Sequence, residues 1–221
     1  MSQASFFAAV QAGDLAEVSR LVEAEPALLH TKNEGGLSAV LLACYTGRND
    51  VRDLLLANDP ALELHEAAAV GQLSRVEELV EADPEVTQGY SPDGFPILAL
   101  AAVFGHEEVA RYLLSQGADV NAVATNGSGY TALTGAVASG HEAIAKWLAE
   151  SGADVNYRYA KGYSPLLTAA ANGRLEIVKM LLARGADLHA RTDDGKNALA
   201  FAEERGHKEV ANHLRQLGLA L

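Results

Sequence analysis

The stretch GYSPLLTAAANGRLEIVKMLLARGADLH, residues 162–189, is the clearest unit of a pattern that runs along the chain. A small apolar segment, PLLTAAA, is followed by Gly173 and then by an amphipathic segment, LEIVKMLLA. Glycine adopts the left-handed backbone that a tight turn between two helices requires. In the second segment, apolar residues recur at helical spacing with charged residues between them, which is typical of a helix that buries one face. The stretch therefore predicts two short helices that pack against each other.

The unit occurs seven times along the chain. Its central glycines are Gly13, Gly47, Gly71, Gly105, Gly140, Gly173 and Gly206, at spacings of 34, 24, 34, 35, 33 and 33 residues. One helix pair cannot bury its apolar face alone, whereas stacked pairs bury a continuous core. We therefore expect one elongated domain over residues 1–221 and no second domain. Its repeats are expected at about 2–34, 35–58, 59–92, 93–128, 129–161, 162–194 and 195–221.

The unit resembles the ankyrin repeat. Residues 162–167, followed by Ala169, Ala170 and Gly173, resemble the signature G-x-T-P-L-H-x-A-A-x-x-G. The segments GADVN at 117–121 and 152–156, and GADLH at 185–189, resemble the loop after the second ankyrin helix. The chain is similar in this to short single-domain bacterial ankyrin proteins. The resemblance implies an all-α solenoid of seven helix pairs, with β-turn fingers and a concave face lined by fingers and first helices.

Two departures from the repeat length predict changes in the fingers. The spacing of 24 between Gly47 and Gly71 is about nine residues shorter than the ankyrin period of about 33. The finger between repeats two and three is therefore expected to be missing, which leaves a notch in the row of fingers. The spacing of 35 places two extra residues around 126–129, so that finger is expected to be longer.

Composition and charge exclude several classes of protein. The chain has 29 acidic and 17 basic residues and a formal net charge of −12, which argues against a general nucleic-acid binder. Residues 1–96 hold 16 acids and 5 bases, whereas residues 97–221 hold 13 acids and 12 bases, so the excess of acid belongs to the N-terminal half. A single cysteine, Cys44, excludes an internal disulfide framework. With no apolar stretch long enough to span a membrane and no secretory signal recognised, a cytoplasmic protein is expected.

Aromatic and basic residues gather on the predicted fingers of the C-terminal half. In the ankyrin register, Phe95, Tyr130, Tyr163 and Lys196 occupy one finger position in successive repeats, and Phe104, Ser139, Asn172 and Arg205 form a second column at the inner ends of the first helices. Aromatic residues and arginine dominate binding hot spots. We therefore predict that the concave face and fingers of repeats four to seven bind a partner. The predicted binding residues are Phe95, Phe104, Tyr130, Tyr157, Arg158, Tyr159, Lys161, Tyr163, Asn172, Arg191, Lys196 and Arg205. The alternative is that the finger tyrosines only pack on one another and stiffen the fingers.

The sequence predicts a binding protein rather than an enzyme. Three His-Glu pairs begin at His65, His106 and His141, but none has the second histidine four residues on that a helical zinc site needs. His106, His141 and His207 each follow a turn glycine, which indicates a structural role at the start of the second helix, in which the ring bonds backbone groups. We expect a monomer that binds another protein through an acidic or polar segment, with no cofactor, no metal and no nucleic acid. The alternative function is a redox or stress accessory protein regulated through a partner or through Cys44.

Overall fold

The computed structural model describes residues 3–220. Over these residues, fourteen α-helices form seven consecutive pairs, and the two helices of each pair pack on each other. The pairs are α1 (Gln3–Ala12) with α2 (Leu15–Ala24), α3 (Ala39–Tyr45) with α4 (Asn49–Ala57), α5 (Leu64–Val70) with α6 (Leu73–Ala82), α7 (Ile97–Phe104) with α8 (Glu107–Ser115), α9 (Ala132–Ser139) with α10 (Glu142–Glu150), α11 (Pro165–Ala171) with α12 (Leu175–Ala183), and α13 (Ala198–Glu204) with α14 (Lys208–Gln216). This confirms the prediction of an all-α solenoid of helix pairs.

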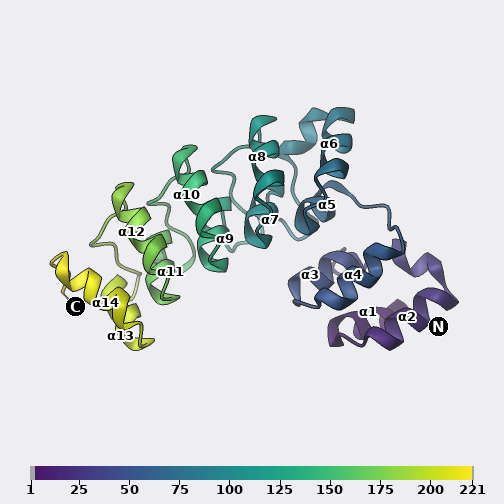
Figure 1. The fold of residues 1–221 in the computed structure, drawn as a ribbon, viewed down its shortest axis with the longest axis horizontal. Helices are drawn as coiled ribbons and strands as arrows, with labels where there is room; N and C mark the ends of the chain where they lie inside the picture. Colours follow the sequence, from purple (N-terminus) through teal and green to yellow (C-terminus); the bar gives the residue numbers. More distant parts are fainter. Residues whose placement is uncertain (1–2, 221) are drawn as a thin grey trace.

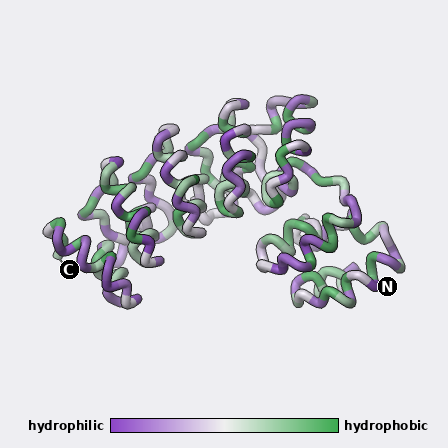
Figure 2. The backbone as a smooth tube through the Cα atoms, in the orientation of Figure 1, coloured by the Kyte–Doolittle hydropathy of each residue, from purple (hydrophilic) through white to green (hydrophobic). Residues whose placement is uncertain are grey.

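The pairs stack into an arch with the two ends of the chain at opposite ends of the array (Figure 1). From α5 onward, the first helix of each pair lies on the inner side of the arch and the second helix on the outer side. First helices are rich in alanine, and Ala99, Ala101 and Ala102 of α7 are fully buried. Small side chains let neighbouring first helices approach closely, which builds one continuous core from Phe6 to Leu219. Hydrophobic and hydrophilic residues alternate along the helices, as expected for elements that bury one face (Figure 2).

Short loops with little regular structure connect one pair to the next. The described residues contain four isolated antiparallel bridges, which join Lys32 to Ser38, Tyr90 to Pro96, Tyr159 to Tyr163, and Arg191 to Asn197. Three short 3₁₀ helices complete the loops: η1 (Pro26–His30), η2 (Pro84–Gln88) and η3 (Ala160–Gly162). Side-chain caps fix where several first helices begin; the oxygen atoms of Ser38 and Asn197 accept hydrogen bonds from the backbone N–H of Leu41 and Ala200. The caps thus set the position of each loop relative to the helix that follows.

Histidines after the turn glycines join the fourth, fifth and seventh repeats to the repeat before each of them. The Nε2 atoms of His106, His141 and His207 lie 2.9–3.0 Å from the carbonyl oxygens of Ala69, Val103 and Ala171, a distance that requires the hydrogen on Nε2. None of the three side chains caps its own helix. The prediction that these rings bond backbone groups is confirmed, but each ring bonds a carbonyl of the preceding repeat and not the start of its own helix.

The joint between the second and third repeats is built differently from the others. Only residues 58–63 connect α4 to α5, and no bridge forms among these residues. The turn glycines of the first, third, fourth, fifth and sixth repeats are each covered by a side chain of the following repeat, whereas no atom of another residue lies near the position of a Cβ at Gly47. The first helices α3 and α5 still pack on each other. At this joint the first helices are therefore in contact, whereas the turn of the second repeat is not covered by a side chain of the third.

Candidate functional site

Seven aromatic rings form a continuous row from the second repeat to the seventh, which we call the aromatic ladder. In order, its members are Phe104, Tyr45, Phe95, Tyr130, Tyr159, Tyr163 and Phe201, with successive ring centroids 5.2–6.5 Å apart and tilted planes. Phe95, Tyr130, Tyr159 and Tyr163 stand on the connecting loops, and the other three stand on first helices. Tilted aromatic pairs at such distances attract each other beyond the area that they bury.

The ladder contains more rings than the sequence register predicts. Phe95, Tyr130 and Tyr163 follow one another in space as expected, but Tyr159 lies between the last two. Tyr45 and Phe201 were not among the predicted residues. The signal that could have found them is an aromatic residue at a first-helix position where no other repeat has one.

Beside the ladder, residues of repeats four to seven line a depression of about 400 Å³, which we call the tyrosine pocket. Three ladder rings form its aromatic wall: Tyr130, Tyr159 and Tyr163. The remaining lining residues are Ser128, Ala138, Ala160, Lys161, Thr168, Ala171, Asn172 and Arg205. The structure thus brings together six of the predicted binding residues, from two predicted columns and one finger.

Hydrogen bonds hold the walls of the tyrosine pocket. The hydroxyl groups of Tyr159 and Thr168 bond to each other, and burial raises the pKa of Tyr159 to about 12. Asn172 Nδ2 donates to the carbonyl oxygen of Ala138 at 3.3 Å, and Arg205 Nη1 donates to that of Ala171 at 3.2 Å. These bonds cross between repeats, so the pocket is formed before any ligand arrives.

Three of the four predicted finger bases are already engaged within the protein. Arg158 Nη2 lies 3.3 Å from Asp193 Oδ1, and Lys196 Nζ lies 2.8 Å from Glu204 Oε2. Arg191 Nη1 donates to the carbonyl oxygen of Gly195 at 2.6 Å. Among the described residues, neither Lys161 nor Arg205 forms an ion pair. Tyr157, the remaining predicted residue, is part of neither the ladder nor the tyrosine pocket.

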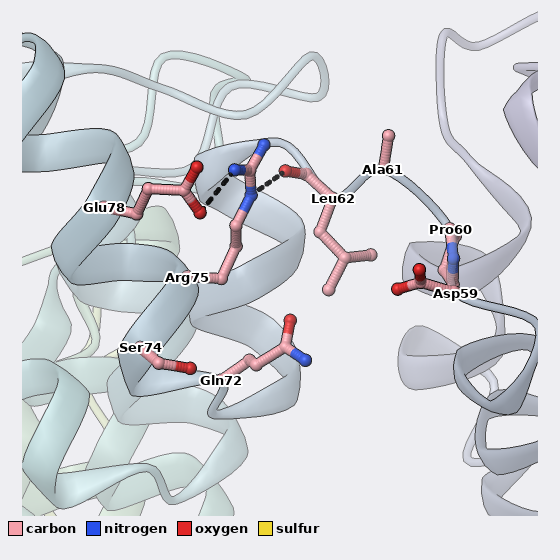
Figure 3. A pocket seen from close by; sticks show the side chains of 8 residues that line it. All are labelled: Asp59, Pro60, Ala61, Leu62, Gln72, Ser74, Arg75 and Glu78. Atoms are coloured by element: carbon pink, nitrogen blue, oxygen red, sulfur yellow. Dashed lines mark hydrogen bonds and ion pairs between the residues drawn. The ribbon is translucent and has the colours of Figure 1, made fainter.

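Two further depressions lie in the N-terminal half, and their cations are neutralised. The groove at the notch, about 440 Å³ in volume, lies between residues 59–62 and the start of α6 (Figure 3). There Arg75 donates from Nε to the carbonyl oxygen of Leu62 at 3.1 Å and pairs through Nη1 with Glu78 at 2.7 Å (Figure 3). A depression of about 690 Å³ beside α1 includes Lys32, which pairs with Glu63 at 2.5 Å. Neither depression offers the unpaired positive charge found in the tyrosine pocket.

The described residues contain no cluster of three histidine, cysteine or acidic side chains that could hold a metal ion. Within residues 3–220, no helix has the length and apolar character needed to cross a membrane. Cys44 is buried in α3, and burial raises the pKa of its thiol to about 11. A buried thiol with a raised pKa is a poor nucleophile at neutral pH.

Comparisons with known proteins agree with the repeated geometry. A family model of three ankyrin repeats matches residues 64–159, and a second ankyrin model matches residues 148–202. Ankyrin repeat and SAM domain-containing protein 6 of Rattus norvegicus is 36% identical over 107 residues, which are 48% of this chain and 12% of that protein. Protein phosphatase 1 regulatory subunit 27 of Mus musculus is 35% identical over 118 residues, which are 53% of this chain and 60% of that protein. The matched segments therefore cover less than two thirds of these relatives.

Proposed function

The chain belongs to the ankyrin repeat family, and from that premise we propose that it is a non-enzymatic module that binds another protein through the concave face and fingers of repeats four to seven. A rigid, preformed surface binds with little loss of conformational entropy. The stacked first helices and the hydrogen bonds between repeats give this surface its rigidity. The mouse relative is named as a regulatory subunit of a phosphatase, which is a role of the same general kind.

The tyrosine pocket is the single observation that carries this proposal. It combines three tyrosine rings, an amide and two basic side chains in one depression, and tyrosine and arginine are enriched in binding hot spots. The pocket lies between fingers and first helices, where the ankyrin resemblance expects the concave face. The partner segment is proposed to be acidic or polar, since Lys161 and Arg205 have no ion pair within the described chain.

The other interpretation is that the ladder only stiffens the fingers. Ring contacts between successive loops would also arise in that case, so the contacts alone do not separate the two interpretations. Removing the rings distinguishes the two interpretations, because each predicts the loss of a different property. A surface used for binding loses its partner, whereas rings that only pack lose stability and leave the bound proteins unchanged.

The test is affinity capture from the native host lysate with quantitative mass spectrometry. The variant combines Tyr130→Ala with Tyr163→Ala, and we expect it to lose the captured partner while far-ultraviolet circular dichroism keeps the helical signal. Tyr90→Ala is the matched control, because Tyr90 is 44% exposed on a loop outside the ladder. Capture by the double variant at the wild-type level would show that the binding surface lies elsewhere.

A further inference from the structure

Two cations at the tyrosine pocket are left without a counter-ion by the protein itself. Lys161 is exposed on the loop at its edge, and Arg205 stands at the end of α13. Three acidic residues of the neighbouring finger and of α13 pair with other bases: Asp193 with Arg158, Glu204 with Lys196, and Glu203 with Arg215. The internal pairing of these acids leaves a local excess of positive charge beside the tyrosine rings.

The guanidinium of Arg205 is already oriented but only partly used. Its Nη1 donates to the carbonyl oxygen of Ala171 at 3.2 Å and to Asn172 Oδ1 at 3.4 Å. The Nε and Nη2 groups make no hydrogen bond with the described residues. Arginine has five N–H donors in a planar fork that matches a carboxylate, so the free edge is suited to one.

The backbone at Lys161 holds a charged side chain in an uncommon conformation. Its φ is 60° and its ψ is 23°, in the left-handed region that favours glycine. The following residue, Gly162, also has a positive φ, and the carbonyl oxygen of Lys161 accepts a hydrogen bond from the backbone N–H of Asp193 at 3.0 Å. Sparsely populated backbone conformations cluster at binding sites, where the surroundings maintain them. The neighbouring finger thus fixes the position of Lys161.

We propose that the tyrosine pocket takes one side-chain carboxylate of an extended partner segment between Arg205 and Lys161, while an apolar residue next to it packs on the rings of Tyr130 and Tyr163. The inference rests on the proposed function and names the chemistry that the partner must present. The apolar contact comes from the rings and from Ala138 and Ala171, and the charge from the two bases. An aspartate or glutamate beside an aliphatic or aromatic residue meets both demands.

The experiment selects ligands for the full chain from a random dodecapeptide library displayed on phage. Selected peptides are then synthesised with a fluorescent label, and their affinity is measured by fluorescence polarisation. We expect the peptides to share an acidic residue next to an apolar one. Replacing that acid by its amide should weaken binding about tenfold, the size expected for one hydrogen-bonded charged group. High salt should reduce the difference, because exposed charges are screened.

Two protein variants assign the carboxylate to the pocket. Arg205→Gln and Lys161→Asn remove one charge each, and asparagine tolerates the left-handed backbone at position 161. Each variant should bind the acidic peptide more weakly than the wild type does. In the double variant, replacing the peptide acid by its amide should no longer change the affinity. Lys179→Gln is the matched control, since Lys179 is an exposed base on α12 that pairs with Glu176. This control should bind as the wild type does.

Several outcomes would overturn the inference, and they separate it from the proposed function. A selection that returns no acidic motif, or no peptide at all, overturns it. Equal effects of amidation on the wild type and on the double variant also overturn it. If the selected peptides share no acidic residue and still lose affinity with Tyr130→Ala, the carboxylate inference fails but the proposed surface stands. If the affinity of every peptide is unchanged by Tyr130→Ala, both fail.

Discussion

The imidazole of His141 packs against Gly105 of the preceding repeat, and its Nε2 lies 2.9 Å from the carbonyl oxygen of Val103. A Cβ atom at Gly105 would come within 2.7 Å of Cε1 of His141, which is too close for two carbon atoms. The turn glycine therefore serves two purposes. It ends the first helix in a left-handed conformation, with φ 85°, and it leaves room for the side chain that joins the next repeat.

We expect Gly105→Ala to lower the free energy of unfolding by about 2–4 kcal/mol, because a left-handed backbone costs alanine roughly 1–2 kcal/mol and overpacking against His141 costs a similar amount. The matched control is Gly47→Ala. Gly47 also has a positive φ, of 64°, but nothing lies within 4 Å of its Cβ position. This control should lose only the backbone part, about 1–2 kcal/mol. Urea denaturation measures both values, and equal losses would mean that the contact with His141 contributes nothing.

Stability should also decrease in mildly acidic solution. Burial lowers the pKa of His65 and of His106 below the ordinary value of 6.5. The unfolded chain then takes up protons before the folded chain does. The contribution of these residues is thus complete above pH 6.5 and is lost as the pH falls through their folded pKa values.

We therefore expect a lower urea midpoint at about pH 5.5 than at about pH 7.5, and a smaller difference when His65→Gln and His106→Gln are combined. The charged groups that face His65 are Glu66, Glu63, Lys32 and Asp93. Hydrogen bonding to Lys32 lowers the pKa of Glu63 from 4.5, so this carboxyl titrates at lower pH than the window measured here. The same pH response in the wild type and in the double variant would exclude the two histidines as its cause.

Much of the fold could be predicted because the same sequence pattern occurs in all seven repeats. A glycine at each turn, with small apolar residues before it and an amphipathic segment after it, is enough to place the helices. The spacing of 24 residues after Gly47 likewise corresponds to the short connection of residues 58–63 in the structure. Local spacing determines these features, and spacing can be read directly.

The candidate site was predictable only in part, because charge pairing depends on the tertiary arrangement. The register predicted that Phe95, Tyr130 and Tyr163 follow one another. It could not show that Arg158 reaches Asp193, which is 35 residues further along the chain on the next finger. Phe201 was missed for another reason: an aromatic residue in an apolar helix has the pattern of an ordinary core residue, and Phe201 is indeed buried. Only the structure shows that its ring also completes the ladder.

The interface between the second and third repeats should be the least stable interface of the array. Leu62 is 4% exposed within the short connection, and its carbonyl oxygen accepts the hydrogen bond from Arg75. In stacked repeats, stability is the sum of each repeat and its interfaces with its neighbours. We expect Leu62→Ala to remove about 2–4 kcal/mol from the interface, the usual cost of truncating a buried leucine. Hydrogen exchange should then be faster in residues 3–57 than in residues 64–220.

Leu55→Ala provides the comparison for the notch variant. Leu55 is buried in α4, within the N-terminal pairs rather than in the connection. Leu55→Ala should speed hydrogen exchange in residues 3–57 and leave the exchange of α5 and α6 unchanged. Leu62→Ala should also speed exchange in α5, because α5 begins two residues after Leu62. A uniform increase in exchange over the whole chain with Leu62→Ala would show that the array unfolds as one unit.

Cys44 provides the test of the alternative redox function. Its thiol is buried in α3, and burial raises its pKa from 9.0 to about 11, which lowers the thiolate fraction near neutral pH about a hundredfold. We expect a thiol-specific reagent to label the native protein at least about a hundredfold more slowly than the urea-unfolded chain, since burial also restricts access of the reagent. Cys44→Ser is the control that shows the label to be specific. Labelling of the native protein at the rate of the unfolded chain would restore the redox alternative, because the thiol would then be both accessible and ionised.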